Sequence, residues 1–227
     1  MQLNLYEAFI LLSLDKIKGK FLIDSLSINY GLAGALLLQL SKDEIVRVVS
    51  KKLILEKIKH SENEMLDDCI GLIKNSKKNH SAKYWVNKIG SKAGIYKIQI
   101  LNQLADQGII KIQKKKILWI FTVTSYPVIN SGLVDEFRKK IVDIVLNYNK
   151  PDLESILLLS LVNSCKLTRI FFPDKKDHKK ANARIKELTK EIAIGEAVSQ
   201  TIKEIQAAVI IASTSAVIAA TAATASS

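Results

Sequence analysis

The polar residues that could perform chemistry in this chain do not form a familiar catalytic motif. Asp67 and Asp68 are adjacent, but neighbours on a helix point about 100° apart and do not share one substrate atom easily. His60, His80 and His178 have no carboxylate or hydroxyl motif nearby, and a general base needs such a partner. We therefore expect no catalytic residue and no enzymatic activity.

The cysteines and the apolar segments limit the class of protein further. Cys69 and Cys165 have neither CxxC nor Cys/His spacing, which favours buried free thiols over a zinc site, a disulfide or a cofactor. The apolar run at residues 9–14 is short and has no basic segment before it, so no export signal is expected. The uncharged residues 207–227 are rich in Ala, Ser and Thr, which predicts a packed helix rather than a membrane span. The expected location is cytoplasmic.

The clearest chemical feature is the stretch "KKKILWIF", in which three lysines, residues 114–116, precede an apolar run that ends at Phe121. The chain of 227 residues has a formal net charge of +12, and residues 51–150 carry most of this charge. Such a field attracts anionic lipid, nucleic acid or acidic protein tails without selecting among them. Two arrangements remain open: the apolar residues face a partner, or they pack on the body as one side of a half-buried strand.

Hydrophobic periodicity predicts a mainly α fold, a single compact helical domain over residues 1–227 with peripheral β-hairpins. Residues 30–40 are apolar nearly all round, which indicates a central buried helix. Its Gly and Ala residues at 31–35 let another helix approach closely or leave room for a ligand. β-branched runs at 44–58 predict a hairpin. A first helical segment is expected from Leu5 and is ended by Gly19. The other expected helices lie near residues 61–75, 82–90, 92–107, 131–148, 152–163 and 176–193, followed by an Ala-rich helix at about 196–224 that packs in the body.

Three helix starts are predicted from side chains that can accept hydrogen bonds from free backbone amides. Ser61 precedes Glu64 by three residues, which is the spacing of a capping box. Ser131 and Asp152 stand at the starts of two later helices and are expected N-caps.

Residues 82–124 give the order helix, turn, helix and β-hairpin, which is also the order of a winged helix. In this alternative the chain binds nucleic acid through the helix at 92–107 and a basic wing. The helix has more large apolar residues than basic ones, which favours a core helix and makes nucleic acid the less favoured partner. The apolar residues are Ile95, Ile98, Ile100, Leu101 and Leu104, and the basic ones are Lys92 and Lys97.

Four motifs in order resemble the Golgi phosphoprotein 3 family over nearly the whole chain, and the loss of most of the family's pocket residues, described below, favours a bacterial-type relative. They are "GLAGALLLQL" at 31–40, "NQLADQGIIKI" at 102–112, "TSYPV" at 124–128 and Gly195–Val198 before the Ala-rich helix. The resemblance implies one mostly helical domain without enzymatic activity that binds phosphatidylinositol 4-phosphate at a basic pocket and dips an apolar hairpin into the membrane. It also implies an adaptor for cytosolic tails of membrane proteins.

The resemblance assigns site positions in this chain. The family's aromatic and cationic pocket residues fall on Asp24, Ala33, Gly94 and Lys97, and Lys97 alone keeps its charge. A single ammonium lacks the bidentate grip of arginine, so weak discrimination among anionic headgroups is expected. The implied hairpin, residues 111–124, is also a candidate for self-association. Its lipid-contacting residues are Lys111, Lys114, Lys115, Lys116, Leu118 and Trp119.

Overall fold

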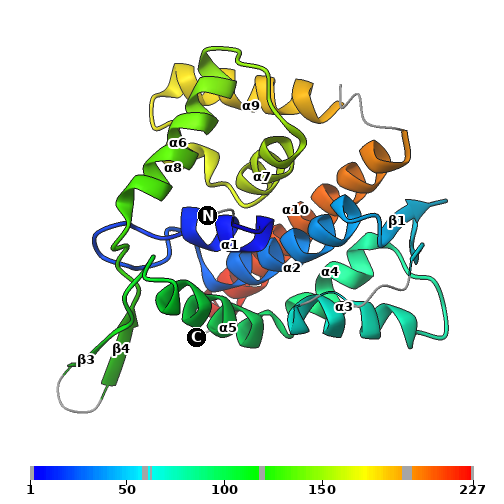
Figure 1. The fold of residues 1–227 in the computed structure, drawn as a ribbon, viewed down its shortest axis with the longest axis horizontal. Coiled ribbons are helices and arrows are strands. Elements are labelled where there is room, and N and C mark those ends of the chain that lie inside the picture. Colours follow the sequence, from blue (N-terminus) through cyan, green and yellow to red (C-terminus); the bar gives the residue numbers. More distant parts are fainter. Residues whose placement is uncertain (1–2, 58–60, 62, 118–120, 191–195, 226–227) are drawn as a thin grey trace.

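Helices dominate the fold, as the sequence predicts, and two short β-hairpins lie at its edges (Figure 1). The computed structural model describes residues 3–57, 61, 63–117, 121–190 and 196–225. The helices are α1 (Leu5–Leu12), α2 (Ser25–Lys42), α3 (Glu64–Lys74), α4 (Ala82–Gly90), α5 (Ala93–Asp106), α6 (Ser131–Leu146), α7 (Leu153–Ser164), α8 (Thr168–Phe171), α9 (Lys175–Lys190) and α10 (Glu196–Ala225). The strands are β1 (Val46–Val49), β2 (Lys52–Leu55), β3 (Gln113–Ile117) and β4 (Phe121–Ser125).

Helix α2 is the centre of the core and confirms the predicted buried helix. It packs against α1, α4, α5, α7 and α10, so apolar side chains are buried on every side of it. Its glycines stand at close helix contacts. A Cβ at Gly31 would lie 2.3 Å from the ring carbon Cζ of Phe9, and one at Gly34 would lie 2.5 Å from Cγ2 of Val209. Close packing, rather than room for a ligand, therefore explains both glycines.

The Ala-rich helix α10 runs beside α2 and packs against α4 and β1 as well (Figure 1). Its Ile202, Ile205 and Val209 are buried, and the backbone amide of Val48 donates to Thr201 Oγ1 at 2.8 Å. This confirms the predicted packed helix for the part of α10 whose side chains are described. Among the described residues, no helix has the length and apolarity needed to cross a membrane.

Both predicted hairpins are present. β1 pairs antiparallel with β2, and Ser50 and Lys51 in the turn have φ angles of 48° and 63°. A turn with positive φ at both central residues matches the twist of the strands that it joins. β3 pairs antiparallel with β4, with Lys115 opposite Val123.

Two of the three predicted helix starts were wrong by one or two residues. α3 is capped by Asn63, whose side chain accepts from the amides of Met65 and Leu66, rather than by Ser61. At α6 the N-cap position is Asn130, so Ser131 is already the first helical residue. Asp152 caps α7 through the amide of Ser155, as predicted. Asn, Asp and Ser are nearly equal as caps, so the sequence does not decide between neighbours.

Candidate functional site

The hairpin of β3 and β4 is fixed at its base by backbone hydrogen bonds to the loop between α1 and α2. The amide of Tyr126 donates to the carbonyl oxygen of Gly19 at 2.7 Å, and the amide of Val128 donates to that of Lys16 at 3.0 Å. Gly19 has φ of +62°, and a Cβ there would lie 2.2 Å from the backbone nitrogen of Pro127. Only glycine fits this contact, so the loop and the base of the hairpin form one rigid unit.

The lysines predicted on the hairpin are all exposed. Neighbouring residues of a strand point to opposite faces, so Lys114 and Lys116 share one face of β3 and Lys115 lies on the other. Both faces are therefore open to solvent, and residues 113–116 are not half-buried against the body. None of these lysines, nor Lys111, forms a salt bridge with a described carboxylate. The hairpin projects from the body beside α5 (Figure 1).

The two residues predicted at the apolar tip, Leu118 and Trp119, lie outside the described residues. The described strands of the hairpin, β3 and β4, carry the lysines and show the direction in which the hairpin projects. The predicted role of these two residues stays a prediction.

An exposed apolar residue lies in the loop at residues 15–20 and was missed by the sequence-based prediction. The side chain of Ile17 is 87% exposed. The Asp15 carboxylate accepts from the amides of Ile17 and Lys18 at 3.0 and 2.6 Å, which fixes the turn that presents Ile17. Lys18 and Lys20 are exposed beside it. The signal in the sequence was the alternation "KIKGK", one apolar residue among lysines.

The hydrogen bonds at Asp15 also affect its ionisation. The amide of Lys18 makes the largest contribution, and together with the amide of Ile17 it lowers the pKa of Asp15 below its ordinary value. The carboxylate that holds the loop is therefore ionised at neutral pH. Lys16 is held differently, in an ion pair with Asp135 of α6.

Lys97, the predicted phosphate contact, extends from α5 over the ring of Phe21, with its ammonium nitrogen 5.5 Å from the ring centroid. Burial lowers the pKa of Lys97, because a cation loses hydration there. Phe21 in turn lies 6.3 Å from the ring of Tyr126. Lys97 is thus near the base of the hairpin and half-buried, and no described carboxylate pairs with it.

The three other positions implied by the resemblance do not form a basic pocket. The Asp24 side chain caps α2 and accepts from the amides of Leu26 and Ser27 and the hydroxyl of Ser27. Burial opposes its ionisation, but these hydrogen bonds outweigh burial and lower the pKa of Asp24. Ala33 is completely buried. At Gly94 an added Cβ would meet no atom within 4 Å, so this position alone has room for a longer side chain.

The interpretation of α5 as a core helix was partly wrong. Ile100, Leu101 and Leu104 are buried, but Ile95 and Ile98 are 64% and 57% exposed. α5 packs against α1, α2 and α4 on one side only. Its apolar residues cover more of the circumference than these neighbours can bury.

The described acidic and histidine side chains considered for catalysis have partners within the fold. Asp68 accepts from Lys92 at 2.9 Å and from the hydroxyl of Tyr96. His80 stacks on Tyr84, with the ring centroids 3.7 Å apart. In the described part of the chain, no group of His, Cys, Asp and Glu could hold a metal ion.

Both cysteines are buried free thiols, as predicted. Burial raises the pKa of Cys69 to about 12 and raises that of Cys165 as well. Neither thiol is ionised at neutral pH, so neither is a reactive nucleophile.

A comparison with protein families gives one match, to the family described as Golgi phosphoprotein 3, over residues 5–205. No curated protein matches the chain. The matched range contains the loop at 15–20, Lys97 and both strands of the projecting hairpin.

Proposed function

Because the chain belongs to the Golgi phosphoprotein 3 family, we propose that it is a peripheral membrane protein that binds anionic phospholipid headgroups at a cytoplasmic membrane surface. It acts as a single domain over residues 1–227, and by binding rather than by catalysis. An adaptor role toward the cytosolic tails of membrane proteins extends the same proposal.

The observation that carries the proposal is the basic, projecting hairpin joined to the loop that exposes Ile17. Lys111 and the lysines at 114–116 are exposed and have no described carboxylate partner. Their field attracts an anionic surface. A nucleic-acid surface would account for the lysines but gives no reason for an 87% exposed isoleucine among them, whereas lipid accepts an apolar side chain.

Attraction between the lysines and an anionic leaflet is too weak to explain membrane binding alone. Each lysine near an anionic leaflet contributes about 1 kcal/mol, so four give about 4 kcal/mol, which corresponds to a Kd of roughly 1 mM. Binding at useful concentrations needs an apolar contribution or self-association. Ile17 supplies one apolar contact, and Leu118 and Trp119 at the tip are proposed to supply more, since Trp favours the headgroup level.

Flotation with anionic vesicles, together with a duplex-DNA gel shift on the same sample at matched salt, tests the proposal against the winged-helix alternative. Co-flotation with vesicles that contain phosphatidylserine or phosphatidylglycerol, and none with phosphatidylcholine alone, is the expected result. A DNA shift at lower protein concentration than vesicle binding would favour the alternative. Absence of flotation with anionic vesicles would overturn the membrane proposal.

A further inference from the structure

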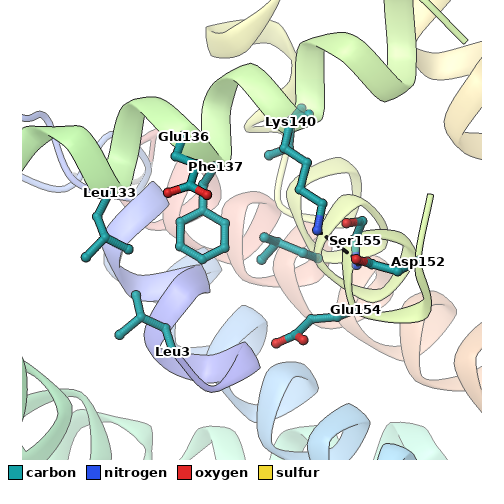
Figure 2. A pocket seen from close by; sticks show the side chains of 10 residues that line it. Leu3, Leu133, Glu136, Phe137, Lys140, Asp152, Glu154 and Ser155 are labelled. Carbon is teal, nitrogen blue, oxygen red and sulfur yellow. Dashed lines mark hydrogen bonds and ion pairs between the residues drawn. The ribbon is translucent and has the colours of Figure 1, made fainter. Parts of the chain in front are cut away.

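A cavity of about 250 Å³ lies between α6, α7 and Leu3, which stands two residues before α1 (Figure 2). Its apolar wall is made by Leu3, Leu133, Phe137, Ile141 and Leu158. None of these residues belongs to the hairpin or to the loop at 15–20, so the cavity is separate from the proposed membrane-binding surface. Its volume is slightly below the range of drug-sized ligand sites, and it suits one ring or a short branched chain.

The charged residues at the cavity are mostly acidic, in a protein whose formal net charge is +12. Figure 2 shows Glu136 on α6 and Glu154 on α7, with Lys140 directed at Asp152. The Lys140 ammonium is 2.7 Å from Asp152 Oδ2, so the one cation of the lining is already paired. Glu154 is 3.5 Å from Lys42, a longer and weaker contact. Glu136 has no ion pair with a described residue.

The start of α7 does not offer a vacant site for an anion. Helix N-termini attract anions because their first amides are free. Here the Asp152 carboxylate accepts from the amide of Ser155 at 2.8 Å, and Glu154 adds a second negative charge in the first turn. A phosphate or carboxylate in the cavity would therefore meet like charges.

From this geometry we infer that the cavity binds a small organic cation, an ammonium group on a compact apolar body. The apolar part fills the space beside Phe137 and Leu158, and the ammonium lies at the opening, where Glu136 and Glu154 accept its hydrogen bonds. This site is independent of the membrane-binding proposal.

The probe is 2-phenylethylammonium, with 2-phenylethanol as the neutral control of the same shape and 3-phenylpropanoate as the anionic control. Titrations of the full chain followed by amide chemical shifts report both affinity and place. Shifts at Phe137 and Ser155 are expected, with a Kd on the order of 1 mM for a ligand of this size. The ammonium is expected to bind at least about tenfold more tightly than the alcohol, because charge-assisted hydrogen bonds are the stronger ones.

Charge-only variants locate the cation. Glu136→Gln and Glu154→Gln should each weaken binding of the ammonium about threefold or more and leave binding of the alcohol unchanged. Asp106→Asn removes one negative charge from an exposed position outside the cavity and should change neither. Equal binding of ammonium and alcohol, tighter binding of the carboxylate, or absence of saturable shifts at Phe137 and Ser155 would each overturn the inference.

Discussion

Replacing Ile17 by serine is the sharpest test of the membrane-binding surface, because this side chain is exposed, ordered and separate from the hairpin lysines. Its side chain is 87% exposed in the free protein, so nearly all of its apolar surface is available to a bilayer. Full burial of an isoleucine side chain stabilises by about 1.5–3 kcal/mol. Insertion to the headgroup level reaches part of this value. We expect a loss of about 1–2 kcal/mol, a fall of roughly 5- to 30-fold in partition onto vesicles.

The same change should leave folding intact. Asp15 holds the loop through the backbone amides of Ile17 and Lys18, and the serine variant keeps both amides. Surface substitutions of this kind usually change the free energy of unfolding by less than about 0.5 kcal/mol. The melting temperature is therefore the internal control. Ile17→Trp should raise partition, since Trp favours the membrane interface.

The assay is vesicle flotation with phosphatidylserine at low and at high salt. Ile17→Ser leaves the charge unchanged, so the salt dependence should keep its slope while the affinity falls at every salt concentration. Val49→Ser is the matched control: Val49 is an exposed apolar residue, 38% accessible, on the hairpin at the opposite side of the molecule (Figure 1). If both variants partition like the unmodified protein, the loop is not part of the membrane contact.

Four other outcomes are expected. Changing the three lysines at 114–116 to Glu should weaken vesicle binding steeply at low salt and less at high salt, because surface attraction is screened; salt-independent binding would contradict this. Vesicles with phosphatidylinositol 4-phosphate should bind at most about threefold better than charge-matched phosphatidylserine vesicles, a difference under about 1 kcal/mol. Gly94→Arg should raise this ratio, because an added side chain at position 94 meets no neighbouring atom. A preference above about thirtyfold that Lys97→Ala abolishes would refute the assignment of the pocket positions to Asp24, Ala33, Gly94 and Lys97. Burial opposes ionisation of Asp152, but hydrogen bonds from Lys140 and Ser155 outweigh burial and lower the pKa of Asp152 to about 2. Asp152→Asn should therefore lower the free energy of unfolding by about 1 kcal/mol at neutral pH, a value reduced because the side chain is exposed to solvent. This difference should fade between about pH 4 and pH 2 in thermal melts. Gly34→Ala should destabilise by about 1–3 kcal/mol in denaturant unfolding, because its methyl group would meet α10; an unchanged midpoint would show that the two helices can separate.

The parts of the fold that the sequence predicted are those in which local pattern and packing agree. Residues 30–40 are apolar nearly all round, and the structure surrounds α2 with other helices. The small residues at 31–35 predicted close contact, and Gly31 and Gly34 meet Phe9 and Val209. β-branched runs likewise predicted the hairpin at 44–58, and the order of elements expected over residues 82–124 included the second hairpin.

The parts that the sequence did not predict depend on which neighbour each face receives. α5 has more apolar residues than its neighbours on one side can cover, so the exposure of Ile95 and Ile98 is a tertiary outcome. The loop at 15–20 has no periodicity from which to infer order, and its order comes from one carboxylate and from its backbone contacts with residues 126–128. The cavity was also missed, because its walls come from three separate segments.

The backbone contacts between loop and hairpin bear on the affinity that the surface can reach. Because Gly19 and Lys16 accept hydrogen bonds from Tyr126 and Val128, the two contact regions move as one body. A second contact on the same rigid body adds its free energy without a second loss of translational and rotational freedom. About 4 kcal/mol from the lysines and 1–2 kcal/mol from Ile17 then correspond to a Kd of roughly 0.04–0.2 mM. Breaking the contact between the loop and the base of the hairpin should therefore reduce membrane affinity by more than the free energy of one lost hydrogen bond.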